Sequence, residues 1–119
     1  MAKSALILSY AGCSTCKKAL KWLAAHNVNA EVRAIVEEPP TKKELAEWMP
    51  RAGLPLKKWF NTSGQSYRAL DKEKVANASE AEVVSWLSKD GKLVKRPVLV
   101  TPKGVLVGFD EAAYAKHFK

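Results

Sequence analysis

The sequence predicts an α/β fold in which a β-α-β half and a β-β-α half are separated by several helices. A short apolar run at residues 5–8, a helical pattern at 19–24 and a loosely alternating run at 28–35 predict the first half. Two apolar runs at residues 98–101 and 105–107, joined by a short turn, predict a β-hairpin in the second half. The first two strands should be parallel, because a helix connects them through a right-handed crossover.

Length and composition fit one compact domain. The chain has 119 residues, of which 47% are hydrophobic, and no repeat, low-complexity segment or linker divides it. The residues before Gly12 include too few apolar side chains for a signal peptide, and no apolar run approaches the length of a membrane span. We therefore predict a single domain over residues 1–119, a cytoplasmic location and no membrane partner.

The first and last helices have clear boundary signals. The first should run to about Ala25, where His26 and Asn27 provide a stop before the strand at residues 28–35. The last should begin after Asp110, whose carboxylate can accept hydrogen bonds from the free N–H groups of a first turn.

A capping box predicts where the second helix begins. Thr41 and Glu44 have the T-x-x-E spacing that satisfies two free N–H groups reciprocally. Pro50 and Gly53 should then end or kink the helix. Its apolar face is formed by Leu45, Trp48 and Met49.

Residues 54–60 predict a short helix and residues 61–66 a polar loop. A second capping box, Ser79 with Glu82, opens a helix that should end near Asp90. All four tryptophans fall on helical stretches and are expected to pack in the core: Trp22, Trp48, Trp59 and Trp86.

Both cysteines lie where the first strand gives way to the first helix. A thiol at a helix N-terminus faces unpaired N–H groups and the positive end of the helix dipole, which favour the thiolate. Cys13 should therefore be the exposed, acidic and nucleophilic thiol, with Lys17 and Lys18 adding positive charge beside it. Cys16, one turn further along, is placed to attack a mixed disulfide or sulfenate formed on Cys13.

Two other interpretations of the cysteine pair remain open at this stage. Zinc would need two further ligands, which only His26 and His117 could supply, and these are not spaced as in a zinc finger. Two inert buried cysteines are the other alternative. A redox dithiol is favoured over both, because a strand, Gly12, the C-x-x-C pair and a helix follow one another in the sequence, and no metal site is predicted.

The formal net charge of +8 and the pI of about 9.6 favour an anionic partner. Nucleic acid, an acidic protein surface, glutathione or an oxyanion would all qualify. The chain has no block of consecutive basic residues and no helix-turn-helix, zinc-finger or RNA-binding signature, so direct nucleic-acid binding is not predicted. A solvated basic face that keeps the protein soluble is the commonest explanation.

Four segments carry a resemblance to a known family: residues 10–19 (YAGCSTCKKA), residues 60–68 (FNTSGQSYR), residues 95–98 (KRPV) and residues 107–109 (VGF). The two halves resemble the thioredoxin-like fold, with its four-stranded mixed sheet, and residues 37–91 resemble the all-helical insertion of the arsenate reductase (ArsC) and Spx family. The resemblance implies a thioredoxin-like core at about residues 1–36 and 92–119.

By this resemblance, Cys13 matches the nucleophile of the family, and Arg96 matches the arginine that precedes a cis proline, here Pro97. Arg96 would place a permanent cation and a planar fork of donors near the thiolate or a bound anion. We assign Cys13, Cys16 and Arg96 to catalysis. We assign six residues to substrate binding: Gly12, Ser14, Thr15, Lys17, Asn61 and Pro97.

The sequence also departs from the family pattern. The arsenate enzymes of this family hold the oxyanion with three arginines, of which only Arg96 is matched, because Asn61 and Gly108 occupy the other two positions. Loss of two bidentate partners removes most of a tetrahedral anion site. Cys16 is more typical of Spx-like members with two cysteines than of the arsenate enzymes.

Two functions are therefore predicted. The first is a thiol–disulfide or arsenate-reductase-like oxidoreductase that acts on a small oxyanion or disulfide, holds no bound cofactor, and receives electrons from glutathione or from a thioredoxin or glutaredoxin partner protein. The alternative is a redox-switched transcriptional regulator of the Spx kind, whose partner would be the α-subunit of RNA polymerase.

Overall fold

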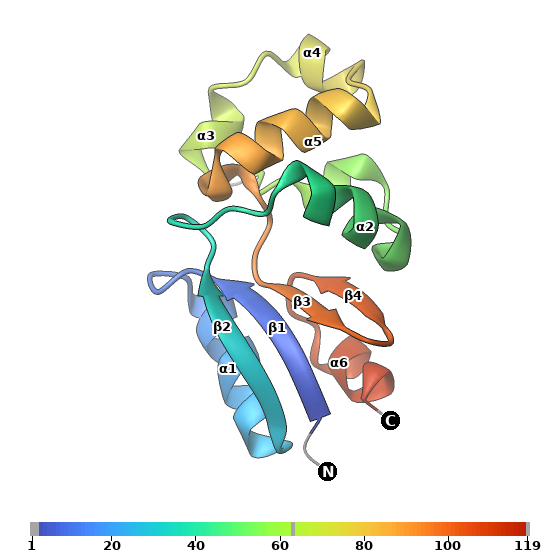
Figure 1. Cartoon of the computed structure of the whole chain (residues 1–119). Helices are drawn as coiled ribbons and strands as arrows, with labels where there is room; N and C mark the ends of the chain where they lie inside the picture. The colour runs from blue at the N-terminus through green and yellow to red at the C-terminus, as the bar shows by residue number, and fades with distance from the viewer. Residues whose placement is uncertain (1–2, 63, 119) are drawn as a thin grey trace.

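Four strands form one mixed sheet in the order β2-β1-β3-β4 in the computed structural model, which describes residues 3–62 and 64–118 (Figure 1). The strands are β1 (Lys3–Ser9), β2 (Val28–Ala34), β3 (Val98–Thr101) and β4 (Gly104–Val107). The strands β1 and β2 are parallel, whereas β3 is antiparallel to both β1 and β4. The predicted α/β fold with a parallel first pair and a C-terminal hairpin is confirmed.

Helices α1 (Ser14–Ala25) and α6 (Glu111–His117) pack on one face of this sheet (Figure 1). Successive side chains of a strand point to opposite faces, so Ile7 and Leu99 face these helices while their neighbours Leu8 and Val98 face the other way. The α1–α6 cluster consists of Ile7, Ala19, Trp22, Leu23, Val28, Leu99, Tyr114 and Phe118. It fixes α1 against the sheet, and with it the position of the first turn of that helix.

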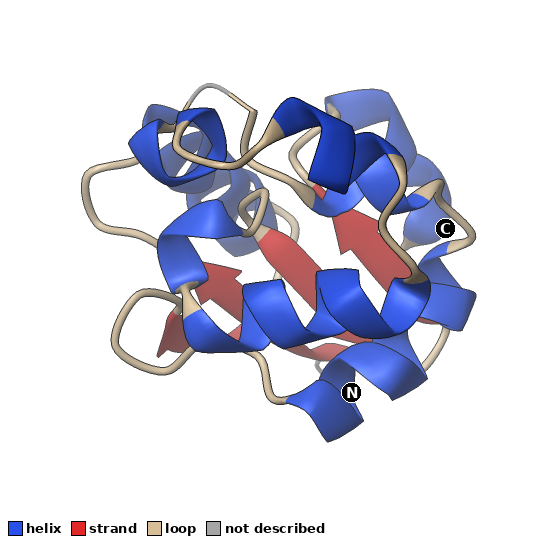
Figure 2. Ribbon diagram, turned by 90° about the horizontal axis from the view of Figure 1, so that it is seen from above, coloured by secondary structure: helices blue, strands red, loops and turns tan. Residues whose placement is uncertain are grey.

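The segment between the two halves is helical, and its helices gather at one end of the sheet (Figure 1), while in the view from above helices surround the strands (Figure 2). It contains α2 (Lys42–Ala52), α3 (Gln65–Arg68), α4 (Lys72–Ala76) and α5 (Glu80–Lys89), with short 3-10 helices η1 (Leu56–Trp59) and η2 (Gly91–Leu93). None of the helices in the described part of the chain is long and apolar enough to span a membrane.

Both predicted capping boxes are present, at Thr41 with Glu44 and at Ser79 with Glu82. The first helix ends at Ala25 and the last begins after Asp110, as predicted. The predicted end of helix α2 at Pro50 and Gly53 is also confirmed, and the helix includes Pro50 in its last turn. It continues to Ala52 and stops at Gly53, which adopts the left-handed conformation (φ 63°) and donates its N–H to the carbonyl of Met49.

The predicted loop at residues 61–66 is too long by two residues, because α3 already begins at Gln65, while Ser63 lies outside the described residues. Helix α4 was not predicted either; Asp71 caps it by accepting hydrogen bonds from the backbone N–H groups of Glu73 and Lys74. Helices of four or five residues contain barely one turn, so they display no recurring apolar spacing.

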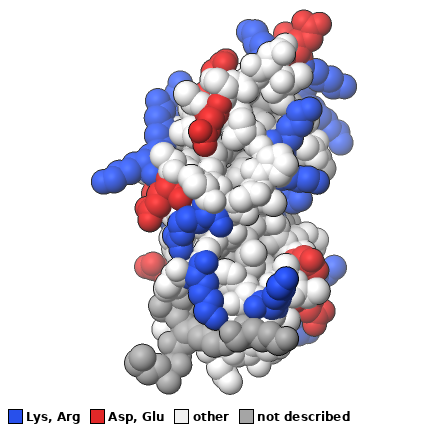
Figure 3. All heavy atoms as spheres, turned by 90° about the vertical axis from the view of Figure 1, so that its right-hand side faces the viewer, with Lys and Arg blue, Asp and Glu red and all other residues white. Residues whose placement is uncertain are grey.

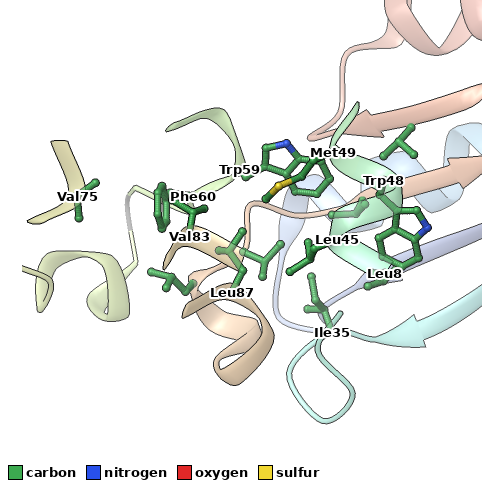
Figure 4. Packing of buried hydrophobic residues seen from close by; sticks show 14 residues of the cluster. Leu8, Ile35, Leu45, Trp48, Met49, Trp59, Phe60, Val75, Val83 and Leu87 are labelled. Atoms are coloured by element: carbon green, nitrogen blue, oxygen red, sulfur yellow. The ribbon is translucent and has the colours of Figure 1, made fainter. Parts of the chain in front are cut away.

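The helical segment shares one hydrophobic cluster with the second face of the sheet. Figure 4 shows Leu45 of α2, Leu87 of α5 and Ile35 beside the end of β2 within this cluster. Trp48 and Trp59 are buried in it and Trp86 packs against it, while Trp22 lies in the other cluster, so the packing role of the tryptophans is confirmed. The insertion cluster consists of Leu8, Ile35, Leu45, Trp48, Met49, Trp59, Phe60, Val75, Val83, Leu87, Leu93, Val94, Val98 and Val105.

Gly91 marks the closest approach between the helical segment and the sheet. A Cβ atom on Gly91 would lie 1.9 Å from the carbonyl oxygen of Ile35 and 2.9 Å from the Cα of Val36. Only glycine lets these two backbone segments touch. The contact sets where the chain re-enters the sheet through residues 94–97.

Candidate active site

Four segments of the chain converge on a cavity of about 610 Å³. They are the turn before α1, the loop after η1, the segment before β3 and the turn between β4 and α6. The lining residues are Gly12, Cys13, Ser14, Thr15, Asn61, Gly64, Lys95, Arg96, Val107, Gly108, Phe109 and Asp110.

This cavity brings together six of the nine predicted site residues: Cys13, Arg96, Gly12, Ser14, Thr15 and Asn61. The other three do not line it. Cys16 and Pro97 are buried behind the wall, and Lys17 lies exposed on α1.

Cys13 is the N-cap residue of α1. Its backbone is extended (φ −97°, ψ 116°), and its Sγ accepts a hydrogen bond from the backbone N–H of Cys16 at 3.3 Å. The N–H of Cys13 itself donates to the carbonyl of Tyr10, which closes the turn that follows β1. The half-buried sulfur therefore stands at the positive end of a helix, and it faces the cavity.

Hydrogen bonds and charge determine the ionisation of Cys13. Burial by itself raises its pKa, but hydrogen bonds with the side chain and backbone of Cys16 and with Arg96, together with the positive charge of Arg96, lower the pKa below that of an ordinary cysteine. Lys17 is not among the groups that shift this pKa. The charge that stabilises the thiolate comes from Arg96, which is distant in sequence.

Cys16 is in the opposite state. Its side chain is 1% exposed, and burial, reinforced by its hydrogen bond with Cys13 and by the charge of Cys13, raises the pKa of Cys16 to about 12. Both cysteines are free thiols in this structure. The pair therefore combines one accessible thiol whose pKa is lowered with one buried thiol whose pKa is raised.

Tyr10 holds Arg96 in place. The guanidinium of Arg96 lies over the Tyr10 ring, 4.6 Å from its centroid. A Cβ atom on Gly12 would lie 2.9 Å from the same ring, so Gly12 leaves the space that Tyr10 occupies. The Arg96–Pro97 peptide bond is cis, as the family resemblance implied.

Several residues of the cavity wall were not predicted as site residues, among them Lys95 and Asp110, whereas Gly108 had been placed only at a position where the family pattern has an arginine. Gly108 adopts φ 83° and donates its N–H to the carbonyl of Pro97 at 2.8 Å, which fixes the turn between β4 and α6. The position of Lys95 next to Arg96 was the only signal in the sequence that could have pointed to it.

The two histidines considered as zinc ligands lie elsewhere. His26 stacks on Trp22 with ring centroids 3.8 Å apart, and His117 is hydrogen-bonded to Thr101. Within residues 3–62 and 64–118, no three side chains of His, Cys, Asp or Glu come together as a candidate metal site.

Replacing Arg96 with glutamine is expected to raise the pKa of Cys13, because the variant loses the positive charge and a charge-assisted hydrogen bond. The rate of Cys13 alkylation should rise with pH and level off above this pKa. In the wild type the midpoint should lie below that of a free cysteine, and in Arg96→Gln it should move to higher pH. Lys17→Gln is the control and should leave the midpoint unchanged; identical profiles for Arg96→Gln and the wild type would contradict the assignment.

The chain is similar to known proteins over most of its length. The model of the ArsC family matches residues 8–117. The uncharacterised protein YusI of Bacillus subtilis is 44% identical over 110 residues, which cover 92% of this chain and 93% of YusI. The Spx global transcriptional regulator of Streptococcus pyogenes is 25% identical over 99 residues, which cover 83% of this chain and 73% of the regulator.

Solved structures are also similar to this protein over most of its length. An ArsC-family-related protein from Bacteroides fragilis superposes with a TM-score of 0.92 at 46% identity, covering 98% of this chain and 99% of that one. A possible arsenate reductase from Streptococcus mutans superposes with a TM-score of 0.87 at 36% identity, covering 96% of this chain and 98% of that one.

Proposed function

The chain belongs to the ArsC family, and we propose that it is a thiol oxidoreductase that reduces small disulfides. One observation carries the proposal: an accessible thiol with a lowered pKa, at Cys13, lies one helical turn from a buried, protonated thiol, at Cys16, at the edge of a cavity. This is the arrangement that a nucleophile and a resolving thiol require.

In the first step, the Cys13 thiolate attacks one sulfur of the substrate disulfide. A bond forms between Cys13 Sγ and that sulfur as the disulfide bond of the substrate breaks, and the other sulfur leaves as a thiolate that takes a proton from water. Cys13 attacks first because it faces the cavity and its pKa is lowered, whereas Cys16 is buried and its pKa is raised.

In the second step, Cys16 resolves the mixed disulfide. Once Cys13 is bonded to substrate it carries no charge, so two of the causes that raise the pKa of Cys16 disappear. Cys16 can then lose its proton to water and attack Cys13 Sγ. The second substrate thiolate leaves and a Cys13–Cys16 disulfide forms, so two electrons have passed from the dithiol to the substrate.

An external thiol must then restore the dithiol. Glutathione, or the dithiol of a thioredoxin or glutaredoxin, can supply the two electrons and two protons by attack on the Cys13–Cys16 disulfide. Arsenate is a weaker candidate substrate than a disulfide. Of the three arginines expected in an arsenate site, the cavity contains only Arg96, with Asn61 and Gly108 at the other two positions.

Replacing Cys16 with serine is expected to stop the reaction after its first step, because a serine hydroxyl does not resolve the mixed disulfide. Incubation with glutathione disulfide should then add one glutathione per chain, attached to Cys13, and a dithiol reagent should release it. Intact-protein and peptide mass spectrometry measure both events. If the wild type turns over the disulfide but Cys16→Ser forms no glutathione adduct, the proposed role of Cys16 is contradicted.

A redox-switched regulator that binds an acidic surface, such as the α-subunit of RNA polymerase, is the alternative. Two observations favour it: the similarity to Spx and the net charge of +8. On the face drawn in Figure 3, however, Lys and Arg side chains are distributed from top to bottom rather than gathered over one element. Redox-dependent capture of the polymerase subunit without any disulfide turnover would favour the regulator.

A further inference from the structure

We infer that Lys95 is a second cation of the Cys13 cavity, which selects disulfides that carry a carboxylate near the reacting sulfur. The inference rests on the proposed disulfide reduction and adds to it the substrate class. Lys95 lines the same cavity as Cys13, but it is separate from the Arg96 contacts that stabilise the thiolate.

The backbone fixes Lys95 at the cavity wall. Its N–H donates to the carbonyl of Trp59 at 2.8 Å, and the preceding residue, Val94, pairs with Phe60 in an antiparallel bridge. Both Trp59 and Phe60 are buried in the insertion cluster. The side chain of Lys95 is exposed, so it extends from a rigid backbone into solvent at the cavity.

Gly108, which has no side chain, leaves room for the side chain of Lys95. A Cβ atom on Gly108 would lie 3.2 Å from Cε and 3.8 Å from Nζ of Lys95. The end of the Lys95 side chain therefore lies beside the space that a side chain at Gly108 would occupy, in the turn between β4 and α6. Any side chain at residue 108 would compete with Lys95 for this position.

The two cations of the cavity have different partners. Arg96 is stacked on Tyr10 and lowers the pKa of Cys13, so its charge serves the thiolate. Lys95 forms no ion pair within the described part of the chain. Asp110 lines the same cavity, but its carboxylate accepts the N–H of Ala112 and caps α6.

The carboxylate of an incoming disulfide would bind the ammonium group of Lys95. A disulfide with carboxylates is repelled by the Cys13 thiolate, and a lysine ammonium beyond the thiolate offsets this repulsion. A cavity of about 610 Å³ accommodates a small organic disulfide. The geometry thus places the reacting sulfur at Cys13 and a carboxylate at Lys95.

The test compares two disulfides of the same shape, dithiodipropionate with terminal carboxylates and dithiodipropionamide with neutral amides. The rate of Cys13 modification by each is measured by acid quench and mass spectrometry. In Lys95→Gln, the ratio of the carboxylate rate to the amide rate should fall about fivefold, the size expected for one partly exposed charge pair. High salt should shrink this difference.

Lys92→Gln is the matched control, because it removes an equal charge three residues away, outside the cavity lining. Lys92→Gln should leave the rate ratio at the wild-type value. Lys95→Arg, which keeps the charge, should retain most of the wild-type ratio. An unchanged ratio in Lys95→Gln, or an equal fall in Lys92→Gln, would overturn the inference while leaving disulfide reduction intact. A wild-type protein that reacts with neither disulfide would instead contradict the proposed function itself.

Discussion

Replacing Gly91 with alanine is expected to lower the free energy of unfolding by about 3 kcal/mol, the upper range for forcing extra atoms into a packed site. The added Cβ would lie 1.9 Å from the carbonyl oxygen and 2.7 Å from the carbonyl carbon of Ile35, and 2.9 Å from the Cα of Val36. These are backbone atoms, which cannot rotate away as the end of a side chain can. The helical segment and the end of β2 would have to separate, and Ile35, Leu87 and Leu93 would lose packing.

Urea unfolding of the reduced protein measures this loss. Gly53→Ala is the matched control, since Gly53 has φ 63° but no atom within 4 Å of an added Cβ. The free energy of unfolding of Gly53→Ala should fall by only about 1 kcal/mol, because alanine is strained in the left-handed backbone conformation. If both variants lose the same amount, the contact between Gly91 and Ile35 does not limit stability.

Replacing Cys13 with serine is expected to lower disulfide turnover by about a thousandfold or more, as removal of a catalytic nucleophile does in other enzymes. A serine hydroxyl stays protonated at neutral pH, so the attacking thiolate is lost. The fold should survive, because serine is a preferred N-cap residue and its oxygen can accept the Cys16 N–H as the sulfur does.

Turnover and melting temperature, measured together, separate these two effects. The Cys13→Ser protein should melt close to the wild type while losing activity. Cys16→Ser, at a buried position, should retain the first chemical step. Substantial turnover by Cys13→Ser would show that another group performs the chemistry, and unfolding of this variant would show that the sulfur is needed for structure.

Most elements of the fold could be predicted because their signals are local. Capping boxes at Thr41 and Ser79, the stop at Asn27 and the hairpin at residues 98–107 each depend on residues close together in the sequence. Helix α4 was not predicted, because a helix of about one turn shows no recurring spacing of apolar residues. Helix α2 passes through Pro50 because a proline in the last turn removes only one hydrogen bond, so Gly53 determines the end.

The candidate site was predictable where its residues are close in sequence and unpredictable where they meet only in space. The cysteine pair lies within one turn, so its spacing indicated a dithiol. Lys17 was expected to support the thiolate, but it lies exposed on α1 away from the cavity. Tyr10 meets Arg96, and Gly108 meets Lys95, only because the turns around the sheet place them there.

The separation of the two hydrophobic clusters has a consequence for how this protein can evolve. The α1–α6 cluster holds the helix that carries Cys13 and Cys16, whereas the insertion cluster holds the backbone from which Asn61 and Lys95 reach the cavity. Substitutions in the insertion cluster can therefore reshape one wall of the cavity without moving the cysteine pair. Substrate preference and thiol reactivity can thus diverge separately among descendants of the same chain.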